Sequence, residues 1–183
     1  QLLLAKKSKL KDSKKSSAVE NFMRIFFLHA ANLSDFNEMV FQAYEDKGIT
    51  LKRSYADNFY IFRDRIGIQG HVDLCINPEL VLEGFLQIGR LKNIKGFDFE
   101  SMKKIREAVP TIDPKFFLSQ AAGNQFIEIL KSQSSLSTIL KKMKQLGILK
   151  LLIPEFGVIE GQMQFDMFHV YSVDEHTFKV VRN

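Results

Sequence analysis

Residues 17–48, SAVENFMRIFFLHAANLSDFNEMVFQAYEDKG, decide the fold class. Apolar side chains recur here at three- and four-residue spacing, which is typical of one face of an amphipathic helix. These residues are Val19, Phe22, Met23, Phe26, Ala30, Leu33, Phe36, Val40, Phe41 and Tyr44. Ser16 or Ser17 is suited to cap the helix, Glu20 to complete a capping box, and Gly48 to end it. The pattern predicts one long amphipathic helix.

The period shifts toward two in the residues that follow this helix, in NFYIFRD (58–64) and RIGIQGHVDLCI (65–76). Such alternation predicts a small β-hairpin. A hairpin alone is marginal in water, so its apolar face should lie on a helix. The candidates for that face are Tyr60, Phe62, Ile66 and Ile68. The polar stretch GITLKRSYAD (48–57) before the hairpin is the preferred internal boundary.

Helix signals dominate the rest of the chain. Asn77 and Pro78 are suited to start one helix, and Asp113 and Pro114 another, while Gly147 is placed to end a third. Pro154 is expected to stop any helix and turn the chain into FGVIEGQ (156–162). The predicted fold class is mainly α, a multi-helix bundle with one small β-hairpin. It is truncated at both ends, because Gln1 is not an initiator Met and residues up to Asn183 still look helical.

Composition excludes several classes of protein. The chain has 183 residues, a formal net charge of +5 and a single cysteine, Cys75. One cysteine allows no internal disulfide and fits a cytoplasmic protein; its apolar neighbours predict a small core residue. No apolar run is long enough to span a membrane. The excess charge lies in the basic tail, residues 1–16, which is interpreted as a solvated linker or truncated helix and not as a nucleic-acid site.

Four histidines are the obvious candidates for chemistry. His29 and His71 have no second ligand at a metal spacing and are interpreted as structural. His169 and His176 share one short segment with Asp166, Asp174 and Glu175, whose side chains are of types that bind divalent metals. Seven residues place the two histidines two helical turns apart, too far to share one ion. Spacing alone therefore predicts at most half of a metal site.

The segment IPEFGVIEGQMQFDMFHVYSVDEHTFKVVRN (153–183) closely resembles the entry into the HD phosphohydrolase domain of the bacterial PII uridylyltransferase/uridylyl-removing enzyme family. GQMQFD and FHVYSVDEHT carry most of the resemblance. VENFMRIFFLHAANLSDFNEMVFQ (19–42) resembles the long helix after that family's nucleotidyltransferase domain. PELVLEGFLQIGR (78–90) and FIEILKS (126–132) fit its helical connector more loosely.

The resemblance implies both a function and a metal ligand. The parent enzyme transfers a uridylyl group from UTP to the PII regulatory protein and removes it by hydrolysis that depends on a divalent metal, Mg or Mn. The HD domain binds this metal through a first His, a His-Asp pair and a later Asp. His176 matches the first His, and the other ligands are absent from the chain, as are the catalytic residues of the transferase. The chain alone is therefore expected to bind metal weakly and to be inactive.

The resemblance also divides the chain. After the basic tail, residues 17–55 would be the long helix that closes the uridylyltransferase part. Residues 56–165 would form a helical connector with the hairpin, at the start of the uridylyl-removing part. Residues 166–183 would be the first helix of an incomplete HD domain. The alternative from another class is a noncatalytic helical scaffold or partner-binding module. A third interpretation, a different HD phosphohydrolase, keeps His176 as a ligand but changes the substrate.

Overall fold

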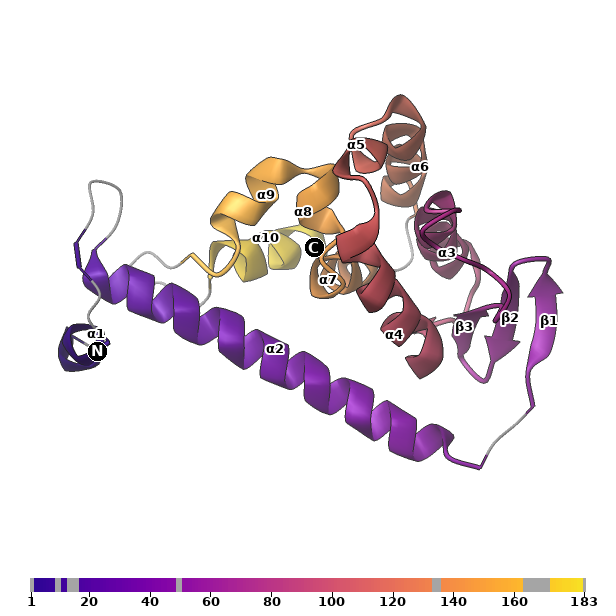
Figure 1. Cartoon of the computed structure of the whole chain (residues 1–183), viewed down its shortest axis with the longest axis horizontal. Coiled ribbons are helices and arrows are strands. Elements are labelled where there is room, and N and C mark those ends of the chain that lie inside the picture. The colour runs from indigo at the N-terminus through magenta and orange to yellow at the C-terminus, as the bar shows by residue number, and fades with distance from the viewer. Residues whose placement is uncertain are drawn as a thin grey trace.

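A computed structural model describes residues 2–8, 11–12, 17–48, 51–132, 136–162 and 172–182. In these ranges helices form most of the molecule and four short strands form one sheet (Figure 1), which confirms the predicted mainly α class. The helices are α1 Leu2–Lys7, α2 Ala18–Asp46, α3 Glu79–Arg90, α4 Phe99–Ala108, the 3-10 helix η1 Val109–Thr111, α5 Pro114–Phe117, α6 Gln120–Leu130, α7 Leu136–Gln145, α8 Leu149–Leu152, α9 Pro154–Ile159 and α10 Val173–Arg182. The strands are β1 Arg53–Ala56, β2 Phe59–Phe62, β3 Arg65–Ile68 and β4 Gly96–Phe97.

Helix α2 has the predicted limits. The Ser17 side chain accepts a hydrogen bond from the Glu20 amide, and the Glu20 carboxylate accepts one from the Ser17 amide, which completes the capping box. At the other end Gly48 has φ of +81°, a left-handed conformation that glycine adopts without a steric penalty. At about 1.5 Å per residue the helix is roughly 43 Å long, and it runs along one side of the body (Figure 1).

The apolar stripe of α2 lies on an unexpected side. An amphipathic helix ordinarily turns this stripe toward the core, yet Phe26, Leu33, Phe36, Phe41 and Tyr44 are all more than half exposed. The buried residues of the helix are Met39 and Gln42. Helix α2 therefore meets the body through a different face.

The sheet is larger than the predicted hairpin. Strands β2 and β3 pair antiparallel as predicted, but β1 adds an edge to β2 and β4 pairs parallel with β3. Strand β1 lies in the stretch interpreted as a polar boundary; its residues are all exposed, so they show no apolar alternation. Strand β4 has two residues, too few for a periodic signal. Neither strand could be predicted from periodicity.

The register also corrects the predicted apolar face of the hairpin. Phe59 pairs with Ile68, and Tyr60 pairs with Gly67. Directly paired residues share a face, and neighbours along a strand alternate. Ile66 and Ile68 therefore lie with Phe59 on one face, while Tyr60 and Phe62 lie on the other. All four predicted residues are buried, but they lie on both faces of the sheet and not on one.

Several helix ends differ from prediction in instructive ways. Helix α3 starts after Asn77, but the Asn77 side chain donates to the Asp73 carbonyl and does not cap the helix. Pro154 ends α8 as expected, yet it also occupies the first turn of α9, where its missing N–H costs nothing. Asp113 caps α5 and Gly147 follows α7 with φ of +75°, as predicted.

One continuous hydrophobic core joins the sheet to the helices. Helix α3 contributes six buried residues, and Phe85 packs edge-on against Phe97 of β4 with ring centroids 5.1 Å apart. Phe178 of α10 belongs to the same core. Cys75, predicted as a core residue, is exposed. None of the described helices has the length and apolar character needed to cross a membrane.

Candidate functional site at the start of α10

His176, the predicted metal ligand, is the fourth residue of α10 and is exposed. Its backbone amide donates to the Ser172 carbonyl over 2.9 Å, so the helical turn that carries the imidazole is formed. Asp174 and Glu175 precede it in the same turn. Acidic residues are favourable there, because the N-terminus of a helix carries a partial positive charge.

Asp174 fixes this turn to the body. Its side chain is 1% exposed and forms an ion pair with the Lys144 ammonium of α7, whose side chain is 15% exposed. The other Asp174 oxygen, Oδ1, accepts the Gly161 amide over 3.2 Å. One buried carboxylate thus connects α10 both to α7 and to the end of α9.

The electrostatic environment favours the charged pair. Burial acts to raise the pKa of Asp174, but the hydrogen bonds from Lys144 and Ser172 and the charge of Lys144 outweigh it, so that pKa lies below its usual value. Burial acts to lower the pKa of Lys144, but its hydrogen bond and attraction to Asp174 outweigh it, so that pKa is raised. Both groups are ionised near neutral pH.

Apolar contacts complete the attachment of α10. Phe178, 1% exposed, packs against Phe156 of α9 with ring centroids 5.5 Å apart. The Lys144 ammonium lies 5.8 Å from the centre of the Phe178 ring, within the range of a cation–π interaction. Ser137 of α7 donates to the Phe178 carbonyl over 3.2 Å. His176 is therefore exposed on a helix whose inner side is held in place.

A polar cleft of about 310 Å³ lies between α2, α7 and α10. Across this cleft the Lys142 ammonium of α7 forms an ion pair with the Glu38 carboxylate of α2 at 2.5 Å. Burial raises the pKa of Asp35 on the same α2 face, although the charges of Arg106, Lys142 and Lys144 oppose the shift. The cleft carries charges of both signs that largely pair with one another, so it resembles a solvated helix interface more than a ligand pocket.

The described residues do not form a complete metal site around His176. They contain no group of three His, Cys, Asp or Glu side chains close enough to bind one ion. The Glu175 carboxylate lies 3.4 Å from Lys144 and 3.6 Å from Lys141. His29 and His71 are exposed on other elements, and His169 and Asp166 fall outside the described residues. The arrangement fits one ligand of a larger site and does not fit a complete metal site.

A second polar cluster was missed by sequence reasoning. Asp98 caps α4 by accepting the Ser101 amide over 2.9 Å, and it also accepts a hydrogen bond from the buried Tyr60 hydroxyl. Lys52 donates to the Tyr60 oxygen over 3.0 Å, and Ser101 Oγ accepts the Ile68 amide over 2.7 Å. One sequence signal could have pointed to it: Asp98 directly precedes a run of apolar residues at helical spacing, which is the position of a helix cap.

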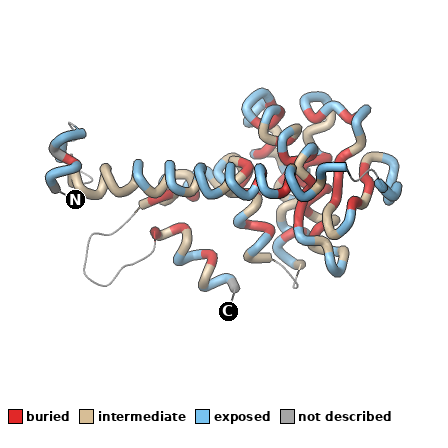
Figure 2. Tube along the Cα trace, turned by 90° about the horizontal axis from the view of Figure 1, so that it is seen from below, coloured by how far each residue is buried: buried red, intermediate tan, exposed pale blue. Residues whose placement is uncertain are grey.

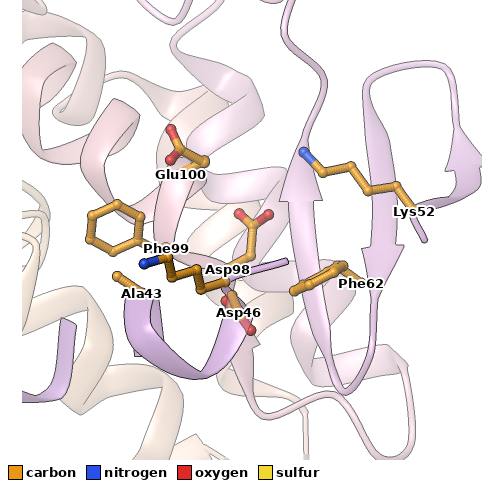
Figure 3. A pocket seen from close by; sticks show the side chains of 8 residues that line it. Ala43, Asp46, Lys52, Phe62, Asp98, Phe99 and Glu100 are labelled. Carbon is orange, nitrogen blue, oxygen red and sulfur yellow. The ribbon is translucent and has the colours of Figure 1, made fainter. Parts of the chain in front are cut away.

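Figure 3 shows the cleft beside this cluster, about 330 Å³ in volume, with Lys52, Phe62, Asp98 and Glu100 around it. Burial raises the pKa of Tyr60, and the hydrogen bond to Asp98 and the negative charge of that carboxylate add to the effect. Tyr60 therefore stays protonated and donates to Asp98 at all ordinary pH values. Because its hydrogen bonds join the sheet to α4, we assign this cluster a structural role.

Comparison with known proteins gives a consistent result across the chain. The protein-family model described as Uridylyltransferase GlnD third domain matches residues 59–151, half of the chain. The chain is 32% identical over 174 residues, 91% of its length, to the bifunctional uridylyltransferase/uridylyl-removing enzyme of Acinetobacter baylyi. It is 31% identical over 94% of its length to the enzyme of the same name from Azotobacter vinelandii. The corresponding values for Nitrosococcus oceani are 32% and 100%.

These relatives are much longer than the chain. The chain spans about a fifth of their length, 20% for the Acinetobacter baylyi and Azotobacter vinelandii proteins and 21% for the Nitrosococcus oceani protein. No solved structure was found to match it.

Proposed function

This chain belongs to the family of bifunctional uridylyltransferase/uridylyl-removing enzymes, and from that premise we propose that it forms the helical connector between the two activities of a longer enzyme. The observation that supports this most strongly is a match to such enzymes over 91–100% of the chain that covers only 20–21% of their length. The longer enzyme would use UTP to uridylylate the PII regulatory protein and would remove the group again by hydrolysis.

In this proposal α10 is the first helix of the uridylyl-removing domain and His176 is the first of its metal ligands. The remaining ligands, which the resemblance gives as a His-Asp pair and a later Asp, would come from residues beyond Asn183. A divalent ion, magnesium or manganese, supplies such a site with an activated water and with positive charge for the phosphodiester oxygens. The contribution of this chain is to hold the helical turn that carries the imidazole in a fixed position.

The attachment of α10 gives this positioning role a physical basis. Tight metal binding requires that the protein fix the position of each ligand. The buried Asp174–Lys144 pair and the packed Phe178 ring hold the inner side of α10, so the helical turn that carries His176 has little freedom to move relative to α7. A connector built in this way would keep the two active sites at a constant separation.

The test separates the two activities. His176→Ala in the complete enzyme should lower the rate of uridylyl removal from PII by about 100-fold or more. Even mutation of a group that only hydrogen-bonds to a metal ligand typically lowers metal affinity or activity by about 10–100-fold. Transfer of the uridylyl group from UTP should stay unchanged. His71→Ala is the control, because His71 is also exposed but lies outside both α2 and α10, and it should leave both rates unchanged. Equal loss of both activities in His176→Ala would contradict the assignment.

Metal binding by the chain alone provides a second test. One imidazole cannot hold a divalent ion tightly, because metal sites need several ligands in a defined geometry. Calorimetric titration of the 183-residue chain with manganese should therefore give no dissociation constant below about 1 µM. Tighter binding that His176→Ala abolishes would mean that the site is complete within this chain.

A further inference from the structure

Helix α2 has two faces of different character. One face meets the body: the Gln42 amide donates to the Phe97 carbonyl over 3.2 Å, Glu38 pairs with Lys142, and Arg24 Nε donates to the Glu160 carbonyl over 3.1 Å. Leu28 lies so close to Gly161 that a Cβ on that glycine would come within 3.0 Å of it. These contacts use one side of the helix from its first turns almost to its end.

The opposite face is mostly apolar and exposed, and it also carries the exposed polar residues His29 and Asn37. Residues three and four apart share a face of a helix, and the large apolar residues on this outer face are 45–78% exposed. They are Ile25, Phe26, Leu33, Phe36, Val40, Phe41 and Tyr44. Figure 2 views the molecule from the side on which α2 lies and shows exposed residues along its length. We call these seven residues the outer face of α2.

The charged residues in the middle of α2 lie on the face that meets the body. Between Ile25 and Tyr44 the sequence contains two charged residues, Asp35 and Glu38. Both serve the side that meets the body: Glu38 pairs with Lys142, and Asp35 is half-buried near Arg106 and Lys142. The outer face is thus uncharged over most of the helix. Surfaces that stay in water or bind only transiently normally carry charged residues.

The outer face is large enough to be an interface. If a fully exposed ring presents about 200 Å², the four aromatic residues alone expose roughly 500 Å². That is already at the upper end of the apolar patches of ordinary monomers, about 300–600 Å². With the three aliphatic residues the area approaches the roughly 800 Å² that each partner buries in a standard interface. A surface of this size and composition is typical of a permanent contact.

We propose that the outer face of α2 is an intramolecular interface, covered in the complete enzyme by an apolar helical layer from the polypeptide that precedes this chain. The proposal rests on the proposed function, in which the chain is part of a longer enzyme, and the relatives have about four times as much sequence outside the matched region as within it. The elements after α2, from β1 to α10, lie on its other side (Figure 1). Because connections are short and consecutive elements are usually neighbours, sequence directly before α2 is favoured as the source of the covering layer.

Thiol reactivity tests this proposal, since the chain has a single cysteine. The probe is Phe36→Cys in a Cys75→Ser background, labelled with a maleimide. It would be made in the 183-residue chain and in the same chain extended upstream in its own reading frame by about 150 residues, a typical domain length, with every cysteine of the extension replaced by serine. Phe36 is 58% exposed, so the substitution should not disturb folding. We expect labelling to be at least about tenfold slower in the extended protein.

Two thiols serve as controls. The native Cys75 is exposed and distant from the outer face in sequence, so without substitution it should react equally fast in both proteins. Met39→Cys, on the side of α2 that meets the body, should be slow in both, because Met39 is 9% exposed. This pair separates covering of the outer face from any general change in the accessibility of α2.

Other outcomes would overturn the proposal. Equal labelling of the Phe36→Cys thiol in both proteins would show that the preceding polypeptide does not cover the outer face. Protection found only in a dimer, identified by light scattering over a range of concentrations, would assign the outer face to a second copy. Neither result depends on uridylyl transfer or removal, which are measured separately, so failure of this proposal differs from failure of the proposed function.

Discussion

Gly67 shows how one missing Cβ shapes the sheet. The ring of Tyr60 lies directly over Gly67, its cross-strand partner, and a Cβ at Gly67 would come within 2.1 Å of that ring. The ring cannot easily move away, because its hydroxyl donates to Asp98 and accepts from Lys52. The glycine therefore makes room for the hydrogen bonds that join the sheet to α4.

This close contact predicts opposite effects for two glycine substitutions. Gly67→Ala should lower the free energy of unfolding by about 3 kcal/mol, the upper part of the range for overpacking. Gly123→Ala in α6 should raise it by about 1 kcal/mol, because a Cβ there meets nothing within 4 Å and alanine favours a helix. Urea unfolding of the two variants measures both values. Equal stabilities would show that the Tyr60 ring moves aside without cost.

At the scale of elements, a charged pair and an aromatic contact decide where α10 lies. The Asp174–Lys144 pair is buried, whereas the Glu128–Lys131 pair of α6 is exposed. Buried charges are costly when one partner is removed, because the other then lies unpaired in the interior. Exposed pairs contribute little, since water screens them. The attachment of α10 should thus depend on Lys144 and hardly on Lys131.

Lys144→Met should lower the free energy of unfolding by about 3 kcal/mol at pH 7, and Lys131→Met should leave it essentially unchanged. The lowered pKa of Asp174 means that the folded state gains from its ionisation above pH 3.8, and that this gain is lost as the pH falls. The raised pKa of Lys144 means that its contribution is present below pH 10.5 and is lost as the pH rises further.

The cost of Lys144→Met should therefore be largest between about pH 5 and pH 10 and should shrink in acid, where Asp174 becomes protonated. Thermal or urea unfolding of the wild type and the variant over this pH range provides the measurement. A cost that does not change from pH 7 to pH 3 would mean that the two side chains are not paired in solution.

At the scale of the whole molecule, α10 shares a hydrophobic core with the elements before it, and the division of the chain into domains stays a prediction. The predicted boundary at residues 165/166 would assign α10 to a different domain from the connector. Phe178 of α10 nevertheless belongs to the same continuous core as the sheet and α3. Within this chain α10 has Phe156 and α7 as its packing partners.

A shared core predicts one cooperative unfolding transition for β1 to α10. With Tyr44 and Tyr171 replaced by Phe, the remaining tyrosines are Tyr55 of β1 and Tyr60 of β2. The transition seen by their fluorescence and that seen by helix circular dichroism should coincide in temperature. Phe178→Ala should lower the midpoint of both together, because it removes a ring that is 1% exposed, at a cost of about 3–5 kcal/mol. Separate transitions, with only the helical signal shifted in the variant, would support the boundary at 165/166.

The sequence by itself determined the helical class, the limits of α2, the β2–β3 hairpin and the enzyme family. Each of these depends on local signals: the period of apolar residues, the Ser17–Glu20 capping box, Gly48 and the motifs of the C-terminal segment. Such signals act between residues close in sequence, so they can be read without knowing what packs against them.

The tertiary structure alone decided which groups meet across long distances in the chain. Lys144 and Asp174, or Tyr60 and Asp98, come together only after the elements between them pack. The same holds for the side of α2 that faces the body, because periodicity identifies an apolar face but not what covers it. The body uses the side with Met39 and Gln42, and most of the apolar stripe is left exposed.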